Sequence, residues 1–528
     1  MNHVARCRPA RGTSRTPAER EVTERWLVDA AYFPGGRADR VVAPRDEAEV
    51  AAVLAAGGPV LAVGAQSSLT GGATPVGGAV LATDALDGFA LDASARTVRA
   101  GAGVALVTLQ AAAREHGLFL APAPTWDGAF VGGAVATNAA GAATFKYGPM
   151  RTAVRALTVV LAGGDVLDVR RGEVRAHPEG WFDIVRCDGR TVRVPVPTYR
   201  DPDVPKCSAG YHAADGMDLV DLFVGSEGTL GVVVAAELAL TPRPASSLAA
   251  WLPFRDEREA LAVVGALRDA SRATWRDGDA RGIDVPAIEH ADRRCIELLV
   301  EDGADRTHGV PLDPRDAVAI FFRVELPDAP SADAAAGALL AGEGPDGPLQ
   351  RLGELLGPHA ERLVAALPGE EARATQLAAV REAVPLAVNH RVRDARLRDP
   401  GVHKVAGDFV VPYERLGEAL ALWRAEFDAR GLDHATWGHI GDGNVHPNVI
   451  PRSAADVAAG KEALLAMGET AVRLGGSPLA EHGVGRHPVK QALLRTLRGA
   501  RGIEEMRAVK RALDPDGHLA PGVLFPAS

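Results

Sequence analysis

The segment 438–446, Gly-His-Ile-Gly-Asp-Gly-Asn-Val-His, constrains the fold most, because it places two imidazoles around an Asp-Gly-Asn turn. In an extended chain, the seven residue steps from His439 to His446 would separate these residues by about 23 Å. A helix would leave about 10 Å between them, and the Gly-Asp-Gly sequence disfavours a helix. A chain reversal at 442–444 costs less, since Asp, Gly and Asn tolerate positive φ. We therefore expect both rings to approach one point, as a metal ion or a bound substrate requires.

The size and charge of the chain predict a folded protein of two or three domains. The chain has 528 residues, of which 47% are apolar, and this exceeds one ordinary hydrophobic core. With a net charge of −10 and no basic stripe, we expect no nucleic acid partner. No apolar run reaches about 18 residues, so no membrane-spanning helix is expected, and the arginine-rich start lacks the apolar core of a secretory signal.

The cysteines are scattered along the chain and form no C-x-x-C pair: they are Cys7, Cys187, Cys207 and Cys295. This argues against a structural zinc site and against an iron–sulfur cluster held within the chain. Disulfides are not expected, which favours a reducing compartment. We therefore expect a cytoplasmic protein, with peripheral docking at the inner face of the membrane as an alternative.

Local patterns predict alternating strands and helices in the amino half. The expected strands are 41–43, 60–63, 79–81, 159–161, 166–169 and 232–240. The expected helices are 46–54, 104–116 and 218–223. Residues 171–205 are polar and interrupted by prolines, which favours an excursion or a long loop, and Thr-Pro-Arg-Pro at 241–244 suggests a domain boundary.

Three glycine-rich stretches in the amino half, 64–72, 128–148 and 225–231, lie next to predicted strands or helix ends. Glycine lets backbone N–H groups approach phosphate oxygens, and Ser67, Ser68 and Thr70 add hydroxyl donors. Each loop alone is better explained as a tight turn between strands, but the three together favour a site for a pyrophosphate. The formal G-x-G-x-x-G at 342–347 follows no strand and contains proline, so it indicates a linker rather than a Rossmann nicotinamide site.

Taken in order, these segments resemble the FAD-linked 2-hydroxy-acid dehydrogenases, the family of D-lactate dehydrogenase and of the flavin subunit of glycolate oxidase. The resemblance is carried by 29–32, 64–75, 124–125, 131–138, 146–148, 206–211, 224–231, 439–446, 481–483 and 513–515. It implies an α+β fold of the vanillyl-alcohol-oxidase type, with an FAD-binding domain of two α+β subdomains (FAD-binding PCMH-type) and an α+β cap domain for the substrate. The expected boundaries are a disordered or extended tail at 1–28, the FAD domain at 29–245, the cap at 246–480, and a segment 481–528 that returns to the FAD domain.

The resemblance also implies which residues bind FAD. They are Gly64, Ala65, Gln66, Ser67, Ser68, Leu69, Gly71, Pro124, Thr125, Gly132, Gly133, Thr137, Glu227, Gly228, Val232 and Asn444. Val63 stands where many relatives have Arg, and Gln66 where they have Gly. No His or Cys lies at 64–68, where relatives with covalent flavin attach it, so non-covalent FAD is expected.

Oxidising a 2-hydroxy acid requires removal of a hydroxyl proton, and this step favours a metal. An alcohol pKa of about 16 against about 6.5 for imidazole leaves roughly 9 units, or about 13 kcal/mol. A divalent cation at the hydroxyl oxygen closes much of that gap. By resemblance, His439, His446 and Glu481 are ligands of zinc or manganese and His482 is the general base. The alternative is that both turn histidines are hydrogen-bonded core residues.

By the same resemblance Arg381 grips the substrate carboxylate, a task that suits its bidentate guanidinium, with Lys404 and Asn448 assisting. Ordinary surface ion pairs are the alternative for the two cations. The expected activity is FAD-dependent oxidation of a small D-2-hydroxy acid, of the D-lactate or glycolate class, to the 2-oxo acid.

Rival activities remain open. They are an oxygen-using oxidase, a D-2-hydroxyglutarate dehydrogenase or an alkyl-glycerone-phosphate synthase type of the same fold, and, from another class, a zinc hydrolase or a metal-binding non-enzyme. Electrons are expected to leave to a separate acceptor, namely a quinone, a cytochrome, an electron-transfer flavoprotein or an iron–sulfur subunit. An oligomer is compatible with the sequence.

Overall fold

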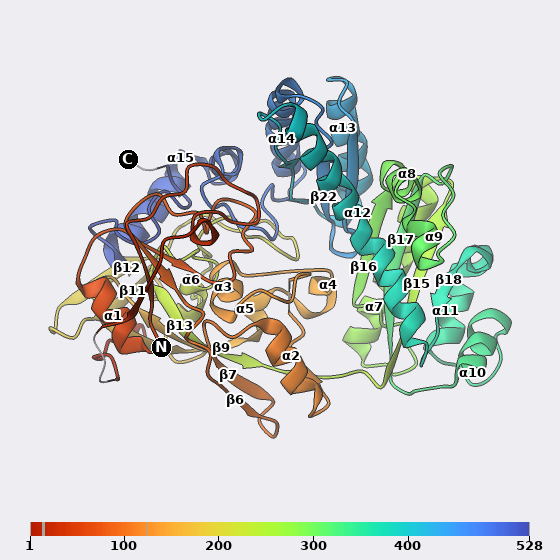
Figure 1. Ribbon diagram of the computed structural model, residues 1–528. Helices are drawn as coiled ribbons and strands as arrows, with labels where there is room; N and C mark the ends of the chain where they lie inside the picture. Colours follow the sequence, from red (N-terminus) through yellow and green to blue (C-terminus); the bar gives the residue numbers. More distant parts are fainter. Residues whose placement is uncertain (1, 13–15, 123, 527–528) are drawn as a thin grey trace. The chain divides into compact units, whose positions relative to one another are not determined.

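The computed structural model describes residues 2–12, 16–122 and 124–526. The chain divides into two compact units (Figure 1). Unit 1 contains Met1–Gly141, Gly148–Arg243 and Leu479–Ser528, and unit 2 contains Ala142–Tyr147 and Pro244–Pro478. The chain passes from one unit to the other near the predicted boundaries at 241–244 and 481. Unit 2 also contains the short segment 142–147, which the sequence did not assign to it. Among the described residues, no helix has both the length and the apolar character that a bilayer-spanning helix needs.

The first sheet of unit 1 has the strand order β2-β3-β5-β4. Its strands are β2 (Ala18–Arg20), β3 (Arg40–Ala43), β5 (Ala79–Ala82) and β4 (Val60–Val63). β5 pairs in parallel with β3 and β4, whereas β2 is antiparallel to β3. Helix α1 (Glu47–Ala55) begins where the Asp46 side chain accepts the N–H of Glu49 at 2.9 Å. This capping bond satisfies a backbone donor that the helix itself cannot, and it explains why the helix starts there.

The second sheet of unit 1 is antiparallel and has the order β10-β9-β13-β7-β6. Its strands are β10 (Val166–Arg170), β9 (Val154–Val160), β13 (Val232–Ala239), β7 (Thr97–Gly101) and β6 (Phe89–Asp92). Its neighbouring helices are α2 (Leu106–Arg114), α3 (Val131–Ala136), α5 (Met150–Ala153) and α6 (Leu219–Phe223), and β8 (Leu118–Phe119) pairs with β14 (Thr241–Pro242). Buried Val42 and Leu81 of the first sheet share one hydrophobic cluster with Val160 and Val234 of the second. The two sheets therefore enclose a common core.

Of the two alternatives predicted for 171–205, an excursion or a long loop, the structure shows an excursion that contains strands. This stretch contains the antiparallel hairpin of β11 (Trp181–Val185) and β12 (Thr191–Pro195). Phe182, Ile184 and Val194 are fully buried, while charged residues between them face outward. The alternation of period two was present in the sequence, but the prolines and charges of the flanking turns obscured it.

The expected disordered or extended tail contains, where it is described, two short paired strands and a 3-10 turn at Glu24–Trp26. β1 (Val4–Arg6) pairs in parallel with β11, and β2 belongs to the first sheet. Arg8 forms ion pairs with Glu47 at 2.5 Å and with Asp168 at 2.6 Å. These two carboxylates, distant in sequence, anchor Arg8 to α1 and β10. Residues 1 and 13–15 of the predicted tail lie outside the described residues.

Unit 2 is built on one antiparallel sheet in the order β18-β15-β17-β16-β21-β22-β19, and β20 also pairs with β22. Its strands are β18 (Val364–Ala366), β15 (Ser246–Phe254), β17 (Val318–Leu326), β16 (Ala287–Asp292), β21 (His434–His439), β22 (Asn444–Val449), β19 (Val405–Ala406) and β20 (Phe409–Val410). Its main helices are α7 (Glu257–Asp277), α8 (Arg293–Glu301), α9 (Ala304–His308), α10 (Ala332–Ala336), α11 (Pro348–Leu356), α12 (Glu371–Arg398), α13 (Leu416–Asp428) and α14 (Ala454–Arg473).

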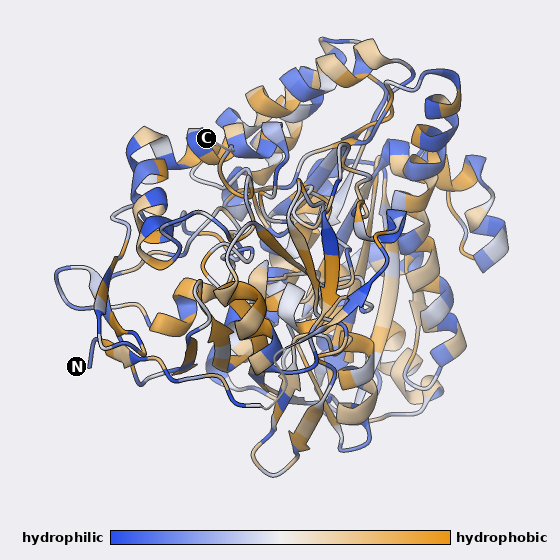
Figure 2. Cartoon of the chain, turned by 60° about the vertical axis from the view of Figure 1, so that its left-hand side comes forward, coloured by the Kyte–Doolittle hydropathy of each residue, from blue (hydrophilic) through white to orange (hydrophobic). Residues whose placement is uncertain are grey.

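Helices α8 and α12 cover one face of this sheet. Trp251, Phe321 and Trp437 of the sheet belong to the same buried cluster as Leu298 of α8 and Val384 of α12. Figure 2 shows the matching pattern, in which the helices of the chain mix hydrophobic and hydrophilic residues. Such mixing is expected of a helix that buries one face and exposes the other.

The segment 142–147 is fixed in unit 2 by charge. It contains α4 (Thr144–Tyr147), whose Lys146 Nζ lies 2.6 Å from Asp284 Oδ2 and 2.5 Å from Glu325 Oε2. The Tyr147 hydroxyl donates to the same Glu325 oxygen at 2.6 Å. These partly buried contacts explain why a segment between two stretches of unit 1 packs with unit 2.

Candidate functional site

Unit 1 contains a cavity of about 320 Å³ that the glycine-rich loops surround. Three backbone stretches form most of its wall: the loop after β4, the start of α3, and the turn 226–228. Gly132 is required by packing, because a Cβ there would lie 2.6 Å from the Cβ of Ala102. All of the predicted FAD-binding residues of unit 1 except Gly71 line this cavity. His482 and Glu481 line it as well.

The loop at 66–74 is held from behind by buried charges. Asp29 accepts the N–H of Gly71 at 2.7 Å, so that N–H points away from the cavity. Arg486, which is 7% exposed, donates to the carbonyl oxygens of Gly71 at 3.0 Å, Thr74 at 2.6 Å and Pro521 at 2.6 Å. Burial lowers the pKa of Arg486 to about 10, so it stays cationic at neutral pH. Gly71 therefore shapes the loop, and Arg486 places a positive charge beside it.

The opposite wall depends on Glu227. Its carboxylate accepts the N–H groups of Val484 and Gly485, each at 2.8 Å, and so ties the loop after α6 to the segment that carries Glu481 and His482. Burial raises the pKa of Glu227 to about 7, and the two backbone hydrogen bonds only partly oppose this effect.

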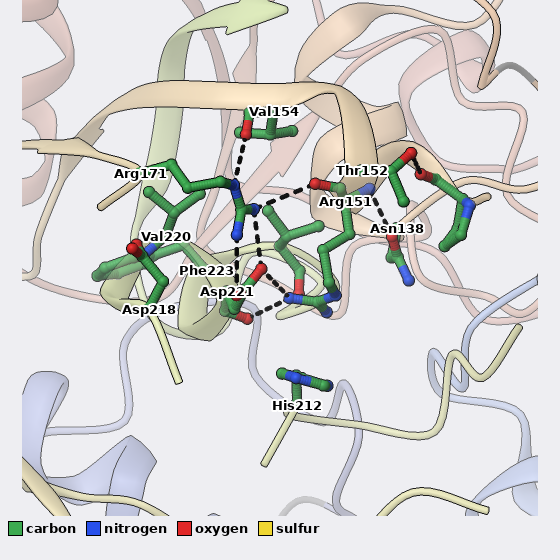
Figure 3. Close-up of polar contacts among 12 residues, drawn as sticks. Asn138, Arg151, Thr152, Val154, Arg171, His212, Asp218, Val220, Asp221 and Phe223 are labelled. Carbon is green, nitrogen blue, oxygen red and sulfur yellow. Dashed lines mark hydrogen bonds and ion pairs between the residues drawn. The ribbon is translucent and has the colours of Figure 1, made fainter. Parts of the chain in front are cut away.

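A buried ion cluster fixes the approach to the Glu227 turn (Figure 3). Arg151 donates to the carbonyl oxygens of Asp221 at 2.6 Å and Val224 at 2.7 Å, and its backbone N–H donates to Asn138 Oδ1 at 3.0 Å. Arg171 joins through an ion pair with Asp221 at 2.9 Å. Burial alone would raise the pKa of Asp221, but the two arginines hold it below its usual value. The cluster thus braces residues 221–224 immediately before the turn.

Glu481 and His482 have a buried lysine as their neighbour. Lys206 is 2% exposed, and its Nζ lies 3.1 Å from Glu481 Oε2 and 3.3 Å from the carbonyl oxygen of Gly141. His482 Nε2 lies 3.5 Å from Glu481 Oε1. The predicted base is therefore at the wall of the predicted flavin cavity, with a carboxylate beside it. Lys206 is part of a motif found in the sequence, but no role was predicted for it.

In unit 2, the chain reverses between His439 and His446 as predicted. β21 and β22 form a hairpin in which His439 pairs with Asn444, and Gly443 takes the left-handed conformation at φ 81°. The two imidazole rings lie with centroids 5.4 Å apart and nearly perpendicular. Both residues are buried. The sequence thus brings together two imidazoles that an extended chain would separate widely.

A carboxylate lies behind each imidazole. His439 Nδ1 lies 3.0 Å from Glu289 Oε2, and His446 Nδ1 lies 3.5 Å from Asp408 Oδ1. Glu289 also accepts Arg381 Nη2 at 3.0 Å. Burial opposes its ionisation, but Arg381 and His439 bring the pKa of Glu289 down to about 2. A carboxylate hydrogen-bonded to Nδ1, as Glu289 is to His439, fixes the tautomer and makes Nε2 the coordinating nitrogen of a metal-binding histidine.

The remaining predicted site residues also lie in unit 2. Lys404 Nζ donates to Asn389 Oδ1 at 3.0 Å and lies 5.9 Å from the centre of the Trp437 ring, and burial lowers its pKa to about 8. The Asn448 amide donates to the carbonyl oxygen of His446 at 2.8 Å. The ion pair of Arg381 is with buried Glu289 rather than with a surface carboxylate.

Asn444, predicted to contact FAD, has structural partners inside unit 2. Its amide donates to Asp408 Oδ1 at 3.2 Å and to the carbonyl oxygen of Phe409 at 2.9 Å. These bonds hold the segment between β19 and β20, which carries Asp408, against the histidine hairpin. The structure thus assigns the Asn444 amide a bracing contact that the sequence did not suggest.

Arg268 of α7 fixes the turn between the two histidines and was missed by sequence reasoning. Its guanidinium donates to the carbonyl oxygen of Gly441 and lies 4.0 Å from the centre of the Tyr413 ring and 5.2 Å from that of Phe145. Burial lowers the pKa of Arg268 to about 10. The sequence signal was weak, because an arginine within a long amphipathic helix is usually exposed. Glu289 gave no clearer signal, because its strand, Ala287–Asp292, also contains His290 and Asp292.

Comparison with known proteins identifies two families. Residues 255–524 match the family described as FAD linked oxidases, C-terminal domain, and residues 38–170 match the family described as FAD binding domain. Among solved structures, an alkyldihydroxyacetonephosphate synthase superposes with a TM-score of 0.56 at 15% identity, covering 92% of this chain and 77% of that one. Together these matches confirm the predicted α+β fold of the vanillyl-alcohol-oxidase type.

Curated relatives cover nearly the whole chain. The D-lactate dehydrogenase of Archaeoglobus fulgidus is 29% identical over 492 residues, which span 91% of this chain and 90% of the relative. Glycolate oxidase subunit GlcD of Bacillus subtilis is 28% identical over 500 residues, spanning 92% and 89%. The D-2-hydroxyglutarate dehydrogenase of Xanthomonas citri is 28% identical over 522 residues, spanning 96% and 91%.

Proposed function

Because this chain belongs to the FAD-linked oxidase family and is an FAD oxidoreductase acting on CH–OH donors, we propose that it oxidises a small D-2-hydroxy acid of the D-lactate or glycolate class to the 2-oxo acid. The observation that carries this proposal is the position of His482 at the wall of the glycine-lined cavity of unit 1. A base beside a flavin site is what removal of a proton and a hydride from one CH–OH group needs.

The residues of the cavity fit FAD. The backbone at 64–70 and at the start of α3 is exposed to the cavity, and the missing Cβ of Gly133 meets no other atom within 4 Å. The charge of Arg486 behind the loop suits the pyrophosphate, and it can take over part of the task for which relatives use an arginine at the position of Val63. When bound, FAD supplies the hydride acceptor.

The donor set also fits a divalent cation. Two buried imidazoles with carboxylates at Nδ1, together with the carboxylate of Glu481, make the N and O ligand set that zinc and manganese accept. When bound, the cation supplies positive charge that lowers the pKa of the substrate hydroxyl.

The side chains of the protein then have separate roles in substrate binding and proton transfer. Arg381 binds the substrate carboxylate through the bidentate fork of its guanidinium. His482 accepts the hydroxyl proton at a ring nitrogen, and Glu481 Oε1, 3.5 Å from its Nε2, stabilises the resulting imidazolium. Asn448 steadies the strand of His446 by donating to its carbonyl oxygen.

The experiment is anaerobic mixing of the purified flavoprotein with D-lactate, glycolate, D-2-hydroxyglutarate and longer 2-hydroxy acids. We expect at least one to bleach the flavin absorbance, the rate to fall at least 100-fold in His482→Ala, and a chelator to slow the reaction until zinc or manganese is restored. An oxidised flavin with every acid would refute the substrate class, and full turnover by His482→Ala would refute the base.

One observation favours D-2-hydroxyglutarate as a second candidate. Lys404 is a half-buried cation whose side chain contacts an amide and a tryptophan ring, and the ion pairs among the described residues give it no carboxylate partner. A substrate with a second carboxylate would supply one. Lys404→Met should then lower kcat/KM for the diacid more than kcat/KM for D-lactate, and an equal loss for both acids would contradict this candidate. We further propose a cytoplasmic location and a separate electron acceptor, with hydrogen peroxide formation at the rate of substrate loss as the sign of an oxidase instead.

A further inference from the structure

Glu289 of β16 is a buried carboxylate that joins two predicted site residues through one oxygen atom. Its Oε2 lies 3.0 Å from Nη2 of Arg381 on α12 and 3.0 Å from Nδ1 of His439 on β21. Glu289 is 6% exposed. No part of the sequence analysis assigned it a role, and neither the substrate-binding arginine nor the metal-binding histidine of the proposed function requires the other.

The sheet explains why these three residues meet. β16 and β21 are neighbours in antiparallel register, with Ala291 opposite Trp437, so the next positions on the same buried face of each strand bring Glu289 beside His439. Helix α12 packs on the same face, where Val384 and Trp437 share the buried cluster. Arg381, three residues before Val384, therefore reaches Glu289 from above the sheet.

The chemistry of the contact differs from that of an ordinary buried ion pair. The oxygen atoms of a buried carboxylate need hydrogen-bond donors, and Arg381 or His439 alone would leave some of their lone pairs without a donor. Glu289 takes a cation on one side and an imidazole N–H on the other, through a shared acceptor atom. Because Arg381 and His439 compete for this oxygen, a change at one of them alters the strength of the hydrogen bond that the other makes.

We propose that Glu289 is a positioning residue that holds Arg381 and His439 in register with each other, and this inference rests on the proposed function. It keeps the proton of His439 on Nδ1, so that Nε2 faces the divalent cation. It also fixes one Nη atom of Arg381, so that the rest of the guanidinium faces the substrate carboxylate. A single carboxylate thus aligns the group that binds the acid with a group that binds the metal.

The test compares Glu289→Gln with a matched control, Glu325→Gln. Glu325 lies in the same sheet and also accepts a cation and a second donor, Lys146 and the Tyr147 hydroxyl. Each variant removes the charge of a carboxylate that accepts hydrogen bonds from two donors. Glu289 is buried and Glu325 is partly buried. Glu289→Asp serves as the conservative variant, which keeps the charge if Glu289→Gln fails to fold.

The readouts are zinc affinity by chelator competition without substrate, KM and kcat for the best acid, flavin content, and thermal unfolding. We expect Glu289→Gln to lose about 10- to 100-fold in zinc affinity and to raise KM by a similar factor, with Glu289→Asp between it and the wild type. Glu325→Gln should lower thermal stability and leave zinc affinity and KM as in the wild type.

The outcomes separate this inference from the proposed function. If the wild type binds zinc and oxidises an acid but Glu289→Gln behaves like Glu325→Gln in zinc affinity and KM, the positioning role is wrong and the proposed function stands. If the wild type binds no divalent cation, or no acid reduces its flavin, the proposed function fails and the positioning role falls with it.

Discussion

Glu227 is a carboxylate in the cavity wall whose pKa burial raises from 4.5 to about 7. Between these two values the folded protein keeps the proton and the unfolded chain does not. The stability that protonation gives is therefore complete below about pH 4.5 and is lost as the pH rises through 7. At about 1.4 kcal/mol per pKa unit the loss is at most about 3 kcal/mol, and less where solvent enters the cavity.

Glu227→Gln removes this titration, because an amide does not ionise. We expect the variant to gain stability relative to the wild type as the pH is raised from 4.5 to 7.5, measured by chemical unfolding at each pH. Glu237→Gln is the matched control with the opposite sign. The hydrogen bond from Arg170 lowers the pKa of Glu237 more than burial raises it, so the stability that its charge contributes is lost as the pH falls. A constant difference between Glu227→Gln and wild type across this range would contradict the assigned pKa.

At the residue scale, the sequence predicted what local chemistry determines and missed what tertiary contacts determine. The cavity-lining glycines and serines are contiguous, so their backbone could be predicted to face one ligand. Glu289, Lys206 and Arg486 act on partners far away in sequence, and each looked like an ordinary charged residue in a strand, a loop or near a helix start. Gly71 shows the same limit, because only Asp29 reveals that its N–H is already used.

At the element scale, α12 carries Arg381 and also contains a proline inside the helix, Pro385. Proline has no N–H to donate to the carbonyl oxygen of Arg381, four residues earlier, and its ring crowds that carbonyl. A proline in a helix interior costs about 3 kcal/mol relative to alanine. Because the carbonyl oxygen that loses its helical donor is that of Arg381, the proposed substrate-binding residue, we expect the proline to influence the position of Arg381.

Pro385→Ala should therefore stabilise the protein and impair binding. We expect the melting temperature of unit 2 to rise by several degrees. We also expect KM for the 2-hydroxy acid to rise several-fold with kcat little changed, because a restored hydrogen bond to the carbonyl oxygen of Arg381 would shift this residue. Leu386→Ala, at an exposed neighbouring position, is the control that changes neither quantity. A higher melting temperature with an unchanged KM would show that the proline does not direct Arg381.

The elements themselves were predictable where apolar periodicity was clean. β3, β4, β5, α1, α2 and the β9–β10 hairpin appear at or within a few residues of their predicted positions. The β11–β12 hairpin was missed because its exposed face is charged and its flanks contain prolines. The pairing of β1 with β11 lay beyond local patterns, since residues 4–6 and 183–185 are brought together only by the fold.

At the scale of the whole molecule, neither unit is a continuous stretch of chain. Unit 1 is closed by its last segment: Val60 N–H donates to the carbonyl oxygen of His518 and Ala520 N–H donates to that of Val60, each at 2.8 Å. These bonds extend the first sheet alongside β4. The return of 481–528 places His482 at the flavin cavity, so the terminal segment contributes to the site as well as to the fold.

Each unit has hydrophobic clusters of its own, which predicts separate responses to ligand and mutation. One large buried cluster contains residues from 249–450 only, and another contains residues of unit 1 only.

FAD at 100 times its dissociation constant adds about 2.7 kcal/mol to the free energy of unfolding of the unit that binds it. In calorimetry of the flavin-free protein we expect two transitions, of which added FAD raises only that of unit 1, by several degrees. Lys146→Met should lower only the transition of unit 2, because it removes the ion pairs to Asp284 and Glu325. A single transition that FAD and Lys146→Met both move would show instead that the two units unfold together.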